Sequence, residues 1–97
     1  MDLKRIAEME RILNECAAAT ADLTAQMDRM EALCEPMSRL FGYYGSVAWY
    51  EDCDGDLPPD FPAGVLSEDA VYTQIEAVRD AAFQMLELAT DILKNRI

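Results

Sequence analysis

The stretch IAEMERILNECAAATADLTAQMDRMEALCEPMSRLF, residues 6–41, decides the fold. Its apolar side chains recur after alternating steps of three and four residues, the heptad spacing of a helix with one apolar seam. The seam consists of Ile6, Met9, Leu13, Cys16, Thr20, Leu23, Met27, Met30, Cys34, Met37 and Phe41, and Ile12, Ala19, Leu33 and Leu40 widen it on one side. Because no glycine interrupts residues 1–35, we expect one long helix over residues 2–35.

A proline and a run of loop residues divide the chain beyond this helix. Pro36 lacks a backbone donor, yet the seam continues in register beyond it, so we expect a kinked or restarted helix over residues 36–42. Ser46 is a suitable N-cap for a short helix over residues 46–53. Residues 54–66 contain three prolines and two glycines and are predicted to be a loop.

A second long amphipathic helix is predicted over residues 67–96. Ser67 is a suitable N-cap, and apolar residues again recur at three-four spacing, at Val71, Ile75, Val78, Ala82, Met85, Ala89 and Ile92. Two such stripes can bury one another as an antiparallel pair. We therefore expect an all-α, single domain over residues 1–97, a helical hairpin with coiled-coil-like seams whose connector folds over one end.

Net charge limits the classes of partner. Nineteen acidic residues against eight basic ones give a formal charge of -11, which repels nucleic acid and anionic membranes. A basic protein partner is the complementary expectation, and solubility is the alternative explanation of the charge. Charges break the apolar residues at the start of the sequence, so we expect no signal peptide there, and no apolar run reaches membrane-spanning length. The odd number of cysteines is typical of a reducing compartment. We therefore expect a cytoplasmic protein.

The segment that joins the two long helices, together with the helix ends beside it, holds most of the net charge and most of the aromatic side chains. Between Leu40 and Val78 there are eight acidic residues and no lysine or arginine, and seven of the eight aromatic residues lie in nearly the same stretch. Exposed aromatics with unpaired acids suit binding of an arginine-rich partner. The alternative is that the aromatics form a small core that holds the connector against the helix ends. The candidate partner-binding residues are Tyr43, Tyr44, Trp49, Tyr50, Glu51, Asp52, Asp54, Asp56 and Asp60.

Catalysis and metal binding are not expected. The chain has no histidine, and its cysteines lack C-x-x-C spacing, so neither a general base of the commonest kind nor a zinc site is present. Asp52-Cys53-Asp54-Gly55-Asp56 begins like a calcium loop, but its glycine is misplaced and position twelve is Ala63. Cys16 and Cys34 lie on a seam that we expect to be buried, and the acidic neighbours of Cys53 should raise its pKa. We predict no cofactor, no metal and no enzymatic activity.

Several motifs resemble a known family of small bacterial proteins. They are Tyr43-Tyr44-Gly45-Ser46 followed by Trp49, the block Gly64-Val65-Leu66-Ser67-Glu68-Asp69-Ala70-Val71-Tyr72, and Met85-Leu86-Glu87-Leu88-Ala89-Thr90-Asp91-Ile92-Leu93-Lys94. With the opening Arg5-Ile6 and Met9-Glu10 pattern, they make the chain similar to the family catalogued as domain of unknown function 4298. The resemblance covers nearly the whole chain and implies a helical fold and a bacterial or phage origin. It implies no activity, cofactor or site residue.

Two hypotheses for function remain open. The first is a non-catalytic interaction or inhibitor protein that engages a basic protein surface, including that of a nucleic-acid-binding protein, where it would compete with nucleic acid. Small acidic phage proteins that inhibit host defence nucleases offer an analogy of charge and size only. The second is a structural or scaffolding protein that forms a homodimer through the long seam, its acids being a solvated coat.

Overall fold

The computed structural model describes residues 1–95 and is helical, with no strand in that part of the chain. Its elements are α1 (Leu3–Tyr43), α2 (Val47–Cys53), the 3-10 helix η1 (Gly64–Leu66) and α3 (Ala70–Asn95). The chain divides into two compact units, Met1–Met37 and Ser38–Ile97. The predicted all-α class and long first helix are confirmed, whereas the single domain stays a prediction. No helix described is long and apolar enough to cross a membrane.

Helix α1 is continuous through Pro36, so the helix does not restart there, and the kink that the sequence suggested stays a prediction. Proline removes one intrahelical hydrogen bond and crowds the preceding turn, at a cost of about 3 kcal/mol. Strong helix formers flank it on both sides, in Glu-Ala-Leu before it and Met-Ser-Arg-Leu after it, and the helix continues to Tyr43. Gly45, in the left-handed region at φ 78°, then ends helical order.

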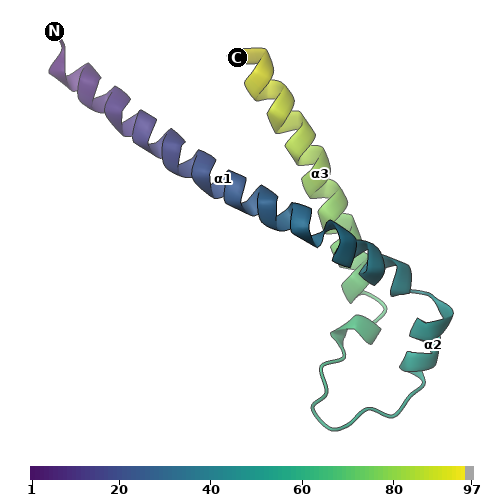
Figure 1. The fold of residues 1–97 in the computed structure, drawn as a ribbon. Helices are drawn as coiled ribbons and strands as arrows, with labels where there is room; N and C mark the ends of the chain where they lie inside the picture. The colour runs from purple at the N-terminus through teal and green to yellow at the C-terminus, as the bar shows by residue number, and fades with distance from the viewer. Residues whose placement is uncertain (96–97) are drawn as a thin grey trace. The chain divides into compact units, whose positions relative to one another are not determined.

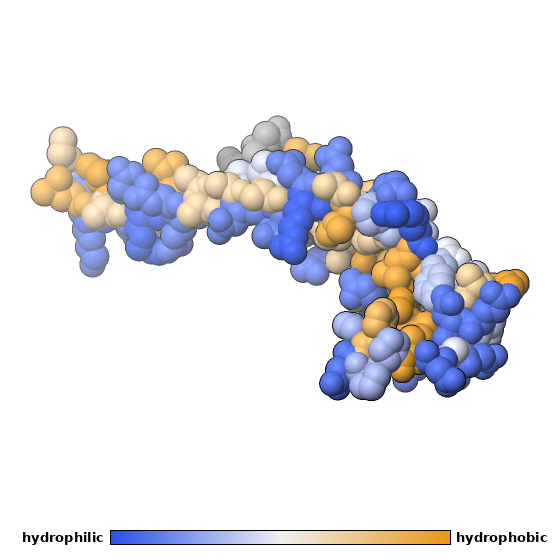
Figure 2. Space-filling view, turned by 60° about the horizontal axis from the view of Figure 1, so that its bottom comes forward, coloured by the Kyte–Doolittle hydropathy of each residue, from blue (hydrophilic) through white to orange (hydrophobic). Residues whose placement is uncertain are grey.

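The apolar seam of α1 is exposed up to Cys34, whereas Met37, Leu40 and Phe41 are half-buried, and burial of the rest of the seam stays a prediction. No residue of α1 is buried, and Cys16 and Cys34 are exposed free thiols. The unit Met1–Met37 contains a single helix, so no second element of that unit covers its apolar side. In Figure 2 the N-terminal part of α1, at the left, shows apolar residues alongside hydrophilic ones.

The two serine caps lie close to where the sequence placed them. Ser46 accepts a hydrogen bond from the backbone N–H of Trp49 at 3.2 Å and caps α2. Ser67 accepts from the N–H of Ala70 at 3.1 Å, and α3 begins at Ala70, three residues later than predicted. The carbonyl of Glu68 accepts a hydrogen bond from the Tyr44 hydroxyl, so residues 68–69 form a turn that precedes the helix. The predicted end at residue 96 lies outside the described residues.

The core of the second unit is small and centred on Trp49. Trp49 and Val71 are the buried hydrophobic residues among those described, at 6% and 4% exposure. The indole Nε1–H of Trp49 donates to the carbonyl of Val65 at 2.9 Å, which ties α2 to η1. Figure 1 shows the loop between the two short helices as an arc that returns η1 toward α2. Part of the predicted loop, residues 64–66, is thus ordered as a 3-10 helix.

Trp49→Ala should destabilise the second unit severely, since it removes the largest buried side chain and leaves the Val65 carbonyl without its donor. We expect the free energy of unfolding to fall by about 3 kcal/mol or more. Urea denaturation followed by circular dichroism measures this. Val47→Ala on the same helix is the matched control, because Val47 is 76% exposed and should change stability by about 0.5 kcal/mol or less. Equal effects of the two substitutions would contradict a core centred on Trp49.

Candidate functional site

The nine residues singled out from the sequence lie in one unit and within one stretch of the chain. Tyr43 ends α1 and Tyr44 follows it, while Trp49, Tyr50, Glu51 and Asp52 belong to α2. Asp54 is the C-cap of α2, and Asp56 and Asp60 lie in the loop that follows. We call this segment, residues 43–66, the connector. The role of these nine residues in binding stays a prediction, whereas the structure gives their surroundings.

Two of the aromatic residues are engaged within the protein. Trp49 is buried against η1, and the ring of Tyr44 meets it edge-on with 5.2 Å between centroids. The Tyr44 hydroxyl donates to the Glu68 carbonyl at 2.6 Å. Both side chains therefore hold the connector together, which is the small-core role that the sequence left open. The donor hydrogen of each side chain is used within the protein.

Tyr50 is different, because it packs on the core and also faces solvent. Its ring lies edge-on to Trp49 at 5.0 Å between centroids, yet the residue is 61% exposed. Such a side chain is held in place on one side and is available for contact on the other. An aromatic residue with restricted motion loses little entropy on binding, which favours it as a binding residue.

A hollow of about 270 Å³ opens on the connector and was not foreseen from the sequence. Its lining comes from the end of α1, α2, the loop and η1, and consists of Tyr43, Glu51, Asp52, Gly55, Leu57, Phe61, Pro62, Val65 and Leu66. Leu57 and Phe61 are 45% and 57% exposed. Figure 2 shows apolar residues gathered between hydrophilic ones in this region, at the lower right.

A turn in the loop brings the apolar lining into place. The N–H of Phe61 donates to the carbonyl of Pro58 at 3.2 Å, which closes a four-residue turn. Asp60 occupies its third position at φ 62°, in the left-handed region that aspartate tolerates better than most residues. The only sequence signal for this lining was the presence of leucine and phenylalanine within a proline-rich loop.

The carboxylates of the connector are exposed and carry the charge of this surface. Glu51, Asp52, Asp54, Asp56 and Asp60 are all exposed, and no lysine or arginine occurs between Arg39 and Arg79. Salt bridges occur elsewhere in the described residues, among them Arg5–Asp2 at 4.0 Å and Arg11–Glu15 at 2.8 Å. The connector therefore presents uncompensated negative charge beside an apolar hollow.

Asp52 also has a partner inside the connector. Its Oδ2 accepts a hydrogen bond from the Tyr43 hydroxyl at 2.5 Å. That bond, together with loss of hydration and the nearby charge, raises the pKa of Tyr43 from 10.0 to about 12. The contact joins the end of α1 to α2 on the wall of the hollow.

Cys53 is a poor candidate for a nucleophile. Loss of hydration raises the pKa of its thiol, and the charges of Asp54, Asp52 and Glu68 raise it further. The Sγ atom lies 3.7 Å from the carbonyl of Leu66, to which the protonated thiol donates. The sequence predicted the direction of this shift and the acidic contribution, but it did not reveal the larger contribution from lost hydration. No group of three metal-ligating side chains is found in residues 1–95.

Comparison with known protein families yields a match over most of the chain. A family model described as Domain of unknown function (DUF4298) matches residues 6–88, a span that includes the whole connector. No curated protein and no solved structure matches the chain.

The Tyr43–Asp52 contact predicts a pH dependence. Because the folded protein holds the phenolic proton of Tyr43 more tightly than the unfolded chain does, the contact contributes stability in full below about pH 10. That contribution is lost as the pH rises through about 12. Asp52→Asn should lower the pKa of Tyr43 toward 10, as measured by the ¹³Cζ chemical shift of the tyrosine. Asp54→Asn removes a neighbouring charge without touching the phenol and should leave the value near 12. A titration unchanged by Asp52→Asn would contradict this assignment.

Proposed function

This chain belongs to the DUF4298 family, and we propose that it is a non-catalytic protein that binds a basic protein surface through its acidic connector. The partner is a protein rather than nucleic acid or a membrane, because a net charge of -11 repels both of those. Proteins that bind nucleic acid are the class of basic partner that suits it best. Occupying their basic surface would make the chain a competitor of nucleic acid.

One observation carries this proposal: exposed carboxylates surround an apolar hollow that has no basic residue nearby in the chain. Glu51 and Asp52 line the hollow together with Leu57 and Phe61. An arginine side chain suits that combination, because its guanidinium pairs with carboxylates while its methylene stem packs on apolar surface. The face of Phe61 adds an attraction for the cation.

Tyr50 and the carboxylates around the hollow have distinct parts in such a complex. Tyr50 provides restrained aromatic area next to the site, and its exposed side is open to a partner. Asp54, Asp56 and Asp60 extend the negative surface beyond the hollow, which steers a basic partner and raises its association rate. Affinity and steering thus come from different side chains of the same segment.

The antiparallel pairing of the long helices also belongs to the proposal. Tyr44, directly after α1, contacts Glu68, just before α3, so the end of the first helix is next to the start of the second. Both helices carry apolar stripes at the same three-four spacing. Packing α3 back along α1 would cover the second half of the α1 seam, including Leu23 and Met27, and would give the connector a rigid support.

Changing charges on the connector should weaken binding to a basic partner. The triple variant Glu51→Gln, Asp54→Asn, Asp56→Asn leaves Asp52 in place because it accepts the Tyr43 hydrogen bond. We expect its affinity for an arginine-rich peptide, measured by fluorescence anisotropy at low salt, to fall by about tenfold, and the difference to shrink as salt is added.

A variant of equal net charge is the control for this experiment. Glu8→Gln, Asp22→Asn, Glu87→Gln changes three exposed carboxylates on the helices. It should lower the affinity far less than the connector variant. Equal losses in the two variants would show that total charge alone attracts the peptide, and the proposed binding surface would then be wrong. Capture from a host lysate with the same pair of variants would identify the natural partner.

A charge on the seam distinguishes the hairpin from the scaffold that pairs along the whole seam. Met27→Glu should lower the free energy of unfolding by about 2 kcal/mol in the hairpin, since a carboxylate would enter its interface. Dilution to concentrations at which the protein is monomeric should leave that loss unchanged. In the scaffold, the same substitution would instead dissociate a dimer, which light scattering detects.

A further inference from the structure

The two long helices differ in length, and the difference leaves part of α1 without a possible partner in its own chain. Helix α1 has 41 residues, and α3 has 26 in the described part of the chain. The contact between Tyr44 and Glu68 sets the end of α1 beside the start of α3. Even a fully antiparallel α3 would therefore leave 15 residues at the start of α1 beyond the reach of its described part. We call residues 3–16 the overhang.

The overhang carries the apolar seam in exposed form. Leu3, Ile6, Met9 and Leu13 are between 50% and 73% exposed. A shallow groove of about 340 Å³ runs along this face and is lined by Arg5, Ile6, Met9, Glu10 and Leu13. Apolar side chains repeated over two heptads on an uncovered helix face are typical of a surface that packs against another helix.

The two charges beside the groove indicate which helix fits it. Arg5 precedes the seam residue Ile6, and Glu10 follows the seam residue Met9. In a parallel coiled-coil pair, a residue that directly precedes a seam residue, such as Arg5 before Ile6, lies beside the residue five positions further along the other copy. For Arg5 that residue is Glu10, which directly follows the seam residue Met9. Arg5 of each copy would then lie beside Glu10 of the other, giving two symmetric ion pairs across the groove.

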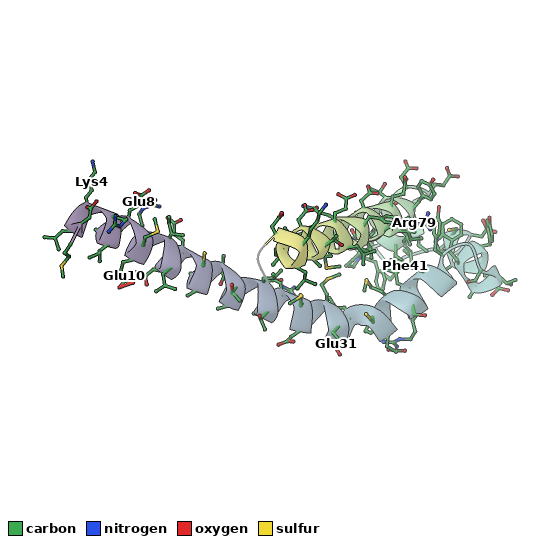
Figure 3. The ribbon with its side chains drawn as sticks, turned by 90° about the horizontal axis from the view of Figure 1, so that it is seen from above. Lys4, Glu8, Glu10, Glu31, Phe41 and Arg79 are labelled. Atoms are coloured by element: carbon green, nitrogen blue, oxygen red, sulfur yellow. The ribbon has the colours of Figure 1, made fainter. Side chains whose placement is uncertain are left out.

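An antiparallel arrangement would oppose like charges. In that case the residues that follow Met9, and those that follow the seam residues at seven-residue intervals after it, face the same positions of the other copy. The charged residues at these positions are Glu10 and Glu31, which are both acidic. Figure 3 shows both glutamates on the same side of α1, with Lys4 and Glu8 on the other side. The charge pattern therefore favours a parallel second copy over an antiparallel one.

We propose that the overhang is the pairing surface for a second copy of this chain, in parallel register, with Arg5 of each copy beside Glu10 of the other. Ile6, Met9 and Leu13 form the apolar contact between the copies. The contact of Arg5 with Asp2 in its own chain, at 4.0 Å, is long and exposed, so it competes weakly. Helix lengths and charge spacing support this pairing, and it does not depend on what the connector binds.

Charge exchange in the full-length chain tests the pairing. Arg5→Glu and Glu10→Arg should each weaken the dimer by roughly tenfold at low salt, because two attractive pairs become repulsive in each variant. The double variant, Arg5→Glu with Glu10→Arg, should restore the wild-type dimer, as measured by sedimentation equilibrium. Circular dichroism checks that each single variant remains helical. A wild-type chain that stays monomeric at the highest concentration tested, or a double variant that is not restored, would overturn the proposal.

Oxidation of Cys16 tests the parallel register separately. Cys16 is a seam residue and an exposed thiol, so in a parallel pair it faces Cys16 of the other copy within reach of a disulfide. A chain with Cys34→Ala and Cys53→Ala should form a disulfide-linked dimer under mild oxidation. A chain that keeps only Cys53, also exposed, is the control and should cross-link far more slowly. Equal rates in the two chains, or no linked dimer through Cys16, would exclude this register.

Discussion

The hydrogen bond and packing of the Trp49 side chain are the interaction on which the connector depends. The indole is buried, donates to the Val65 carbonyl of η1, and receives the edge contacts of Tyr44 and Tyr50. Two segments sixteen residues apart are joined through this one side chain. Without that contact, α2 and η1 would keep only the weaker Cys53–Leu66 contact between them, and the hollow that they line would be less well defined.

A connector with so many carboxylates is opposed by its own charge. Five exposed acids lie within ten residues, and the repulsion between them favours an expanded loop. The Trp49 contact, the Tyr44–Glu68 bond and the Tyr43–Asp52 bond hold the segment against that repulsion. A basic partner would remove the repulsion, so binding and folding of this segment should reinforce each other.

The sequence predicted those features that depend on local spacing. Heptad spacing identified α1, and the serines at positions 46 and 67 marked the two later helices to within a few residues. Features that depend on contacts between distant residues were not predictable in this way. Tyr44 donates to the Glu68 carbonyl in the turn before α3, and a turn at Pro58–Phe61 lies in the loop that contributes Leu57 and Phe61 to the hollow. Of the candidate site residues, Trp49 and Tyr44 proved to hold the connector together. The antiparallel pairing of the long helices stays a prediction.

A basic partner should bind at the connector and not at the acidic surface in general. The most direct measurement is a titration of ¹⁵N-labelled protein with an arginine-rich peptide, followed by two-dimensional nuclear magnetic resonance. The largest shifts should occur at Tyr50, Glu51 and the backbone of residues 54–61, with the indole N–H of Trp49 affected through its neighbour Tyr50. Shifts of equal size at exposed helix carboxylates such as Glu8, Asp22 and Glu87 would contradict it.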